Sequence, residues 1–328
     1  MIEVSGVTKA YGDKNVVNNI SFKVEEGETL VLLGTSGCGK TTTLKMLNSL
    51  IEPTNGVVKI DKKDITSEDP TQLRRKIGYV IQDIGLFPHY TVEQNIAVVP
   101  RLLKWDKAQI KKRSEELLEV LGLSSSWMKR FPNELSGGQQ QRVGIARALI
   151  ADPPVILMDE PFGALDPITR KQIRDEFKNI EAFISKTIVL VTHDVVEAVE
   201  LGDKICLLHD GAIVQMGTPK DLIFSPKNDF VKRFFDNQRF MIELMVMTLE
   251  DMIPVLESRN DQKPEKLQFT KETSLFNALE CVEESVENDI AIEIVNENKK
   301  PMISTDREAL LRAFYGTKDI LSKNRATA

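Results

Sequence analysis

The chain has 328 residues, of which 41% are apolar, 28% are charged and three are cysteines. At roughly 100 to 200 residues a domain, this length predicts about two domains, and the composition is that of a folded globular protein. A small disulfide-stapled module and a disordered chain are excluded, because they carry many more cysteines or far fewer apolar residues. No apolar run exceeds four residues, whereas a membrane-spanning helix needs about 20, so we expect no membrane span.

The net charge of −6 comes from one part of the chain. Residues 1–235 hold 31 acidic and 31 basic side chains, whereas residues 236–328 hold 18 acidic and 12 basic ones. A neutral first part and an acidic second part predict no nucleic-acid partner and no direct adhesion to anionic lipid. The first residues lack the charged and apolar regions of a secretory signal, so the cytoplasm is the expected compartment.

Residues 1–235 alternate between predicted strands and predicted helices. Runs rich in Val, Ile and Leu predict strands over 2–8, 16–24, 29–33, 155–158 and 187–191. Helical patterns cover 42–50, 107–121, 168–183 and 194–201. Such alternation favours an α/β fold with a mostly parallel sheet that is covered on both faces. The charged helix over 107–121 indicates a helical subdomain inserted at about 85–151.

Residues 236–328 are predicted to form a second, small α+β domain. A polar stretch predicts a loop over 258–265, and a β-α-β-α unit follows it. Its elements are a strand over 267–269, a helix over 274–286, a strand over 290–295, a turn over 296–300 and a helix over 305–314. Leu275, Ala278, Leu279 and Val282 form an apolar stripe, which we expect to pack on the same segment of a second copy. Packing on the first domain is the open alternative.

A glycine-rich segment from Gly34 to Thr41 fits the pattern GxxxxGKS/T between a predicted strand and a predicted helix. In this context backbone N–H groups wrap a phosphate, and the helix N-terminus adds its dipole. Lys40 neutralises charge on the β- and γ-phosphates, and the Thr41 hydroxyl ligates Mg²⁺. The predicted nucleotide-binding residues are Gly34, Thr35, Ser36, Gly37, Cys38, Gly39, Lys40, Thr41 and Thr42.

Two carboxylates, Asp159 and Glu160, follow the apolar strand over 155–158. At the carboxyl end of a strand beside the phosphate loop, Asp159 can hold Mg²⁺ through water. Glu160 can polarise the water that attacks the γ-phosphate. The two motifs together predict nucleotide hydrolysis.

The segment Leu135 to Gln139 reads LSGGQ, and with it the chain resembles the ATP-binding cassette (ABC) family. The resemblance implies a P-loop ATPase with an inserted helical subdomain. It also implies a head-to-tail dimer with itself, in which Ser136, Gly137, Gly138 and Gln139 bind the γ-phosphate of ATP on the partner copy.

Further site residues follow from the same resemblance. Tyr11 corresponds to the aromatic residue that stacks on adenine, and Gln82 to the glutamine that senses Mg²⁺ and water and faces the membrane partner. Asp166 lies in the loop that communicates across the dimer, and His193 is the γ-phosphate switch. The implied catalytic residues are Glu160, His193 and Gln82, and the implied metal ligands are Thr41, Gln82 and Asp159.

Two classes of function fit an ABC ATPase: the energy-coupling subunit of a membrane transporter, and a soluble ATPase of DNA repair or translation. One compact cassette with a neutral surface favours transport. The runs over 75–82, 84–89, 91–96 and 158–170 resemble the ATPase subunits of osmoprotectant importers, which take up glycine betaine, carnitine, choline or proline.

The resemblance to this branch implies several partners. They are membrane permease subunits, which hold the chain at the cytoplasmic face of the cell membrane, and, indirectly, an extracytoplasmic solute-binding protein. Residues 236–328 then correspond to a single, degenerate CBS-like regulatory unit. An amino-acid or methionine-type importer is the alternative.

Overall fold

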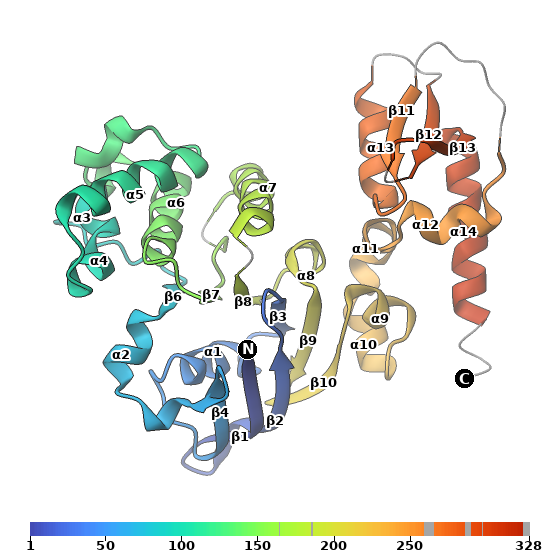
Figure 1. Ribbon diagram of the computed structural model, residues 1–328. Coiled ribbons are helices and arrows are strands. Elements are labelled where there is room, and N and C mark those ends of the chain that lie inside the picture. Colours follow the sequence, from blue (N-terminus) through green and yellow to red (C-terminus); the bar gives the residue numbers. More distant parts are fainter. Residues whose placement is uncertain (164, 185, 259–265, 286–289, 297, 324–328) are drawn as a thin grey trace. The chain divides into compact units, whose positions relative to one another are not determined.

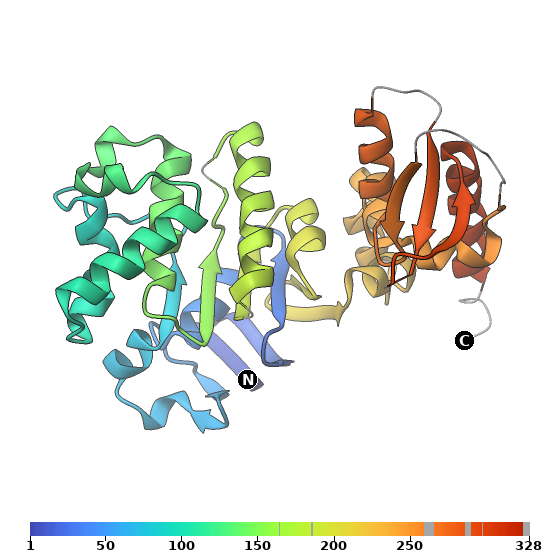
Figure 2. The same cartoon turned by 45° about the horizontal axis from the view of Figure 1, so that its top comes forward.

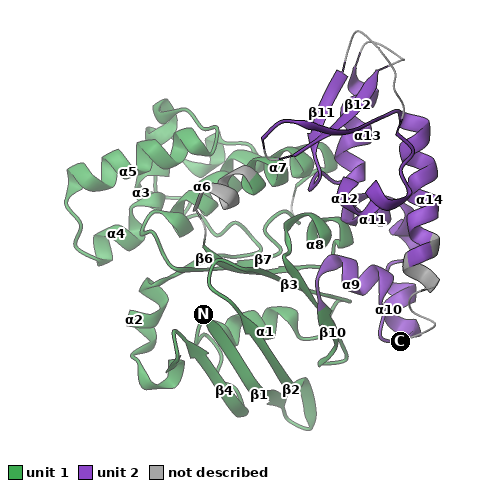
Figure 3. Ribbon diagram, turned by 45° about the vertical axis from the view of Figure 1, so that its right-hand side comes forward, with its two compact units in different colours: residues 1–216 green, residues 217–328 purple. Residues whose placement is uncertain are grey.

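The structure, a computed structural model, describes the chain except residues 164, 185, 259–265, 286–289, 297 and 324–328. The chain divides into two compact units, Met1–Met216 and Gly217–Ala328 (Figure 3). We predicted the first domain to end at residue 235, whereas residues 217–235 group with the second unit in space. A functional boundary at 235 stays a prediction.

The first unit contains a six-stranded sheet with the order β10-β9-β3-β8-β7-β6 (Figure 1). β9, β3, β8, β7 and β6 pair in parallel, which confirms the predicted α/β fold. Every residue of β3 and β8 is buried, as expected for strands covered on both faces. The strands are β3 (Thr29–Gly34), β6 (Ile77–Val80), β7 (Val155–Asp159), β8 (Thr187–Thr192), β9 (Lys204–His209) and β10 (Ala212–Gly217).

A second sheet in this unit has the order β2-β1-β4-β5, and its pairs are antiparallel. The first two predicted strands therefore do not join the parallel sheet. Buried and more exposed residues alternate along β1 and β2, whereas every residue of β3 is buried. The alternation arises because one face of the antiparallel sheet meets solvent. The strands are β1 (Ile2–Tyr11), β2 (Lys14–Val24), β4 (Asn55–Ile60) and β5 (Lys63–Asp64).

The main core of the first unit surrounds helix α1 (Lys40–Leu47). This helix contacts β2 of the antiparallel sheet and β3, β7 and β8 of the parallel sheet. On the other side of the parallel sheet, α8 (Val195–Leu201) packs against β3 and β8. The register pairs Leu33 with Thr192 and Asp159 with Val191, so the carboxyl ends of β3, β7 and β8 lie at one edge beside α1.

Helices between β6 and β7 match the subdomain predicted at 85–151. They are α3 (Val92–Ile96), α4 (Val98–Leu102), α5 (Lys107–Val120) and α6 (Gly137–Leu149), with the 3₁₀ turns η2 (Ser125–Lys129) and η3 (Pro132–Glu134). Outside this group lie η1 (Ile65–Ser67), α2 (Pro70–Arg75) and α7 (Pro167–Ile184). The buried Asn95 fixes the entry to the subdomain, because its amide exchanges hydrogen bonds with the main chain of Phe87 and donates to the carbonyls of Tyr90 and Thr91.

The second unit has a three-stranded sheet with the order β11-β12-β13, shown in Figure 2. β11 (Lys266–Thr270) and β12 (Ala291–Val295) are parallel, and β13 (Pro301–Thr305) pairs antiparallel with β12. The predicted β-α-β-α order was therefore incomplete, because β13 follows the turn near 296–300. Its first residue is a proline, which edge strands tolerate and which weakened the strand pattern.

The helices of the second unit are α9 (Pro219–Phe224), α10 (Asp229–Phe234), α11 (Arg239–Val246), α12 (Leu249–Met252), α13 (Leu275–Glu284) and α14 (Arg307–Lys323), with the 3₁₀ turns η4 (Asp236–Gln238) and η5 (Ile253–Val255). α13 packs against α11 and α14, and Leu275 and Ala278 are buried in this way. Half of the predicted stripe thus has its partner within the unit, which removes the main reason to expect it against a second copy. Seven residues of the predicted loop over 258–265 lie outside the described residues. No helix in the described part of the chain has the length and apolarity that crossing a bilayer requires.

Candidate nucleotide site

Two glycines of the phosphate loop have surroundings that exclude a side chain. Gly34 has φ +155°, and a Cβ atom there would lie 2.3 Å from the Leu208 carbonyl oxygen. Gly39 has φ +102°, and its Cβ atom would lie 2.6 Å from the Val16 carbonyl oxygen. Both contacts are with backbone and cannot relax by a side-chain rotation, so the turn requires glycine at these positions.

Lys40, the first residue of α1, folds back across the phosphate loop. Its Nζ atom donates to the carbonyl oxygens of Gly34, at 2.7 Å, and of Thr35, at 3.0 Å. The side chain is buried, and its ammonium group lies over the loop whose N–H groups would hold a phosphate. The positive charge is therefore positioned before a nucleotide binds.

Asp159, the last residue of β7, meets the phosphate loop at Thr41. The Thr41 hydroxyl donates to Asp159 Oδ1 over 2.9 Å. Burial raises the pKa of the Asp159 carboxyl, and the hydrogen bond from Thr41 and the nearby lysines oppose that rise. Burial and the charge of Asp159 together raise the pKa of Tyr79 to about 12. The Thr41 hydroxyl and the Asp159 carboxylate form a pair of oxygen donors, which is the chemistry that Mg²⁺ prefers.

The three predicted catalytic residues meet at one oxygen atom. Gln82 Nε2 lies 3.3 Å, and His193 Nδ1 3.2 Å, from Glu160 Oε2. Among the described residues, the second oxygen, Oε1, has no hydrogen-bond partner. Glu160 has φ +45°, a conformation that non-glycine residues rarely adopt, and its N–H donates to the Val191 carbonyl of β8. The strained backbone thus aims the carboxylate at Gln82 and His193.

Ser136 begins helix α6 as its N-cap. Its hydroxyl accepts from the Gln139 N–H, and the Gln139 side chain accepts from the Ser136 N–H, which is a capping box. A Cβ atom on Gly138 would lie 2.7 Å from Thr169 Cγ2 and 3.1 Å from Ile173 Cδ1 on α7. Gly138 therefore has a packing role in addition to the role predicted for it. Within the described residues, no hydrogen bond joins this segment to the phosphate loop.

Tyr11 and Asp166, which were also predicted to serve the site, lie on exposed positions. Tyr11, at the end of β1, is 52% exposed, and the Lys9 ammonium lies 5.2 Å from the centroid of its ring. Asp166 accepts from the Thr169 N–H at 3.1 Å, and this bond and the hydroxyl of Thr169 lower the pKa of its carboxyl. Neither bonds to the phosphate loop among the residues described.

One residue that fixes the site was absent from the predictions. The Arg147 guanidinium donates to the carbonyls of Gly85, at 2.7 Å, and Ile84, at 3.2 Å. It thereby holds the chain just after Gln82, and burial lowers its pKa. The bonds go to backbone oxygens, so no residue pattern could have indicated them.

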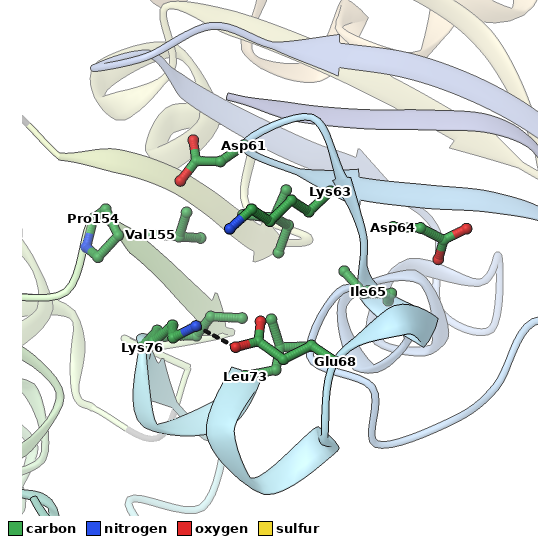
Figure 4. Close-up of a pocket in the computed structure, with 11 residues that line it drawn as sticks. Asp61, Lys63, Asp64, Ile65, Glu68, Leu73, Lys76, Pro154 and Val155 are labelled. Carbon is green, nitrogen blue, oxygen red and sulfur yellow. Dashed lines mark hydrogen bonds and ion pairs between the residues drawn. The ribbon is translucent and has the colours of Figure 1, made fainter.

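A cavity of about 100 Å³ lies elsewhere in the first unit, among β4, β5, α2 and the starts of β6 and β7 (Figure 4). Its wall includes Val155, at the opposite end of β7 from Asp159. Three of its charged groups already have partners, because Lys76 pairs with Glu68 and Asp64 accepts two bonds from Thr66. The cavity is thus separate from the nucleotide site.

The family is decided by two comparisons. A family model described as ABC transporter matches residues 17–163. The chain is also 46% identical to the glycine betaine/carnitine/choline transport ATP-binding protein OpuCA of Bacillus subtilis, over 92% of its own length and 80% of that protein. The chain belongs to the ABC transporter family.

A second relative and a solved structure support the assignment of this ABC ATPase. The osmoprotectant import ATP-binding protein OsmV of Salmonella typhimurium is 44% identical over 100% of this chain and 85% of its own length. The dimeric structure of MJ0796, a bacterial ABC transporter cassette, matches with a TM-score of 0.61 and 38% identity, over 66% of this chain and 98% of that one. The predicted ABC cassette fold, the ATPase activity and the similarity to osmoprotectant importer ATPases are confirmed, and the CBS-like character of the C-terminal unit stays a prediction.

Proposed function

We propose that this ABC ATPase powers an importer of quaternary-amine osmoprotectants of the glycine betaine, carnitine and choline type. The observation that carries the proposal is similarity along most or all of the chain to ATP-binding proteins named for such transport. In this proposal the ATPase acts at the cytoplasmic face of the membrane, bound to separate permease subunits that receive solute from an extracytoplasmic binding protein.

The site supports a division of labour in ATP hydrolysis. The phosphate loop and Lys40 bind the phosphates, because the ammonium already lies over the loop. Gln82 and His193 hold one oxygen of Glu160, so the other oxygen can accept a proton from the attacking water. His193 then faces the γ-phosphate and responds to its presence.

The residues that would hold Mg²⁺ are Thr41, Asp159 and Gln82, all of which offer oxygen donors. When bound, the ion neutralises charge on the β- and γ-phosphates. The described residues contain no group of three or more His, Cys, Asp or Glu side chains that could hold a metal. The ion's remaining ligands would therefore come from the nucleotide and water.

The proposal includes a head-to-tail dimer in which Ser136, Gly137, Gly138 and Gln139 complete the site of the other copy. Its support is the similarity to a dimeric cassette and the absence, among the described residues, of bonds from this segment to its own phosphate loop. Mixing Ser136→Arg chains with Lys40→Ala chains places both lesions in one of the two sites. Partial recovery of ATPase activity over either variant alone is expected, and no recovery in proven heterodimers would contradict the dimer.

The transported solute is tested by uptake in cells that express the chain with its membrane partners. Labelled glycine betaine, carnitine and choline should enter with the wild-type chain and not with the Glu160→Gln chain. Uptake of an amino acid such as methionine, without uptake of any quaternary amine, would replace the proposed substrate class.

A further inference from the structure

Arg170, on α7, lies between two parts of the nucleotide site. Its Nε atom donates to the Phe162 carbonyl at 3.2 Å, and its Nη2 atom donates to the carbonyls of Leu165, at 3.0 Å, and Gly163, at 3.4 Å. Its Nη1 atom lies 3.8 Å from Asp194 Oδ2. One guanidinium group therefore contacts both the loop after Glu160 and the residue after His193.

The loop that Arg170 holds starts at Glu160 itself. The Gly163 N–H donates to the Glu160 carbonyl at 3.1 Å, which closes a tight turn directly after the proposed catalytic base. Phe162 is fully buried and lies edge-on to Phe177, with 6.1 Å between ring centroids. The loop is thus anchored at Phe162 by packing and along its carbonyls by Arg170.

The turn that carries His193 is fixed on both sides. Asp194 begins α8, because its carboxylate accepts from the N–H groups of Val196, at 2.8 Å, and Glu197, at 3.2 Å. Thr192 Oγ1 accepts from the Asp194 N–H at 3.0 Å and donates to the buried carboxyl of Glu197. A shift of Asp194 would therefore move the backbone of His193.

We propose that Arg170 is a positioning residue for ATP hydrolysis, which ties the loop after Glu160 to the turn of His193 and so maintains their 3.2 Å contact. The inference rests on the roles proposed for Glu160 and His193. Arginine is required because its planar fork presents donors in fixed directions, whereas the single ammonium of lysine cannot serve three carbonyls and a carboxylate together. The side chain is 28% exposed, so its charge alone contributes little and its geometry is what matters.

Arg170→Lys in the full chain tests the proposal, with Arg174→Lys as the matched control. Arg174 lies one turn further along α7 and pairs with Glu200 of α8 without contacting the loop or Asp194 through any bond described. Displacing catalytic groups by about 1 Å costs up to roughly 100-fold in rate, so kcat should fall about 10- to 100-fold in Arg170→Lys. The Kd for ATP should match the wild type, the thermal midpoint should fall no further than that of Arg174→Lys, and Arg174→Lys should keep the wild-type kcat.

Asp194→Asn supplies a second measurement, because asparagine still caps α8 but removes the charge that faces Arg170. If Arg170 acts through Asp194, the double variant should lose no more kcat than Arg170→Lys alone. Additive losses would contradict that link. Arg170→Gln, which keeps a planar donor without charge, serves if the lysine variant does not fold.

Three outcomes separate the hypotheses. A wild-type kcat in Arg170→Lys, or a kcat loss that merely follows weaker ATP binding and a lower thermal midpoint, would overturn the inference. Glu160→Gln and His193→Ala belong in the same series. If Glu160→Gln and His193→Ala keep turnover, the proposed catalytic roles of Glu160 and His193 are wrong. If both variants are inactive while Arg170→Lys is active, only the proposed role of Arg170 is rejected.

Discussion

Glu160→Gln replaces one carboxylate oxygen by an amide group of the same size. The amide oxygen can still accept from Gln82 and His193, which lie 3.3 and 3.2 Å from Oε2 in the wild type. In the proposed mechanism the side chain would lose the charge that polarises water and the ability to take its proton. A positioned general base contributes about 100- to 10,000-fold, so the activation free energy should rise by about 3 to 5 kcal/mol.

The same substitution should leave folding and nucleotide binding intact. The phosphate loop and Lys40 make no bond to Glu160 in the described structure, and glutamine fits the cavity of glutamate, so stability should change by less than about 1 kcal/mol. Phosphate release at saturating ATP measures the rate, and equilibrium binding of labelled ATP measures the affinity. Glu115→Gln, on the exposed face of α5, is the control for loss of a carboxylate. Turnover by Glu160→Gln close to that of the control would refute the assignment of the base.

Three further predictions concern other parts of the chain. Gly34→Ala should abolish ATP binding, because its Cβ atom would overlap the Leu208 carbonyl oxygen, and binding at wild-type affinity would disprove the steric argument. At neutral pH a disulfide reagent should modify the exposed Cys281 fast, and Cys281→Ser should remove this fast reaction. Burial raises the pKa of the Cys38 and Cys206 thiols, that of Cys206 to about 12, so these two residues hold little of the reactive thiolate. Glu243→Gln should lower the free energy of unfolding of the second unit by about 1 to 3 kcal/mol in urea titrations, because two basic side chains bond to this fully buried carboxylate and water can partly solvate them once its charge is removed. An unchanged midpoint would show that the pairs are not stabilising.

The sequence predicted the centre of the site because the rules of parallel sheets are local and strong. A carboxylate at the end of a buried strand must lie at the edge where the neighbouring phosphate loop starts, and Asp159 does so at hydrogen-bond distance from Thr41. The separate antiparallel sheet was not predicted, because the sequence of a strand does not show which strand it pairs with. A strand that is buried on one face shows the same alternation whichever partner it pairs with, so pattern alone left β1 and β2 unplaced.

The glycines of LSGGQ show why a recognised motif need not have a single cause. Gly138 has no room for a Cβ atom because Thr169 and Ile173 of α7 lie against it, so the packing of α6 on α7 already demands glycine. Ser136 likewise has a structural role that needs no nucleotide, because it caps α6. A substitution in this segment can therefore change activity through helix packing. The thermal midpoint of such a variant must be compared with that of the wild type before a loss of activity is assigned to a lost contact with the phosphate.

Residues that bond to the main chain are the part of a site that sequence patterns reveal least. Arg147 and Arg170 each hold loop carbonyls, at Ile84 and Gly85 and at Phe162, Gly163 and Leu165. Every residue has a carbonyl, so the sequence of a loop does not indicate which side chain will bond to it. An arginine on a helix is typical of an exposed surface position. Glu160 and His193 could be named from their motifs, whereas the motif over 158–170 does not indicate the role we propose for Arg170 in maintaining their 3.2 Å contact. In this ATPase the proposed reacting groups can therefore be predicted from the sequence, whereas the residues proposed to hold them in place are found only in the fold.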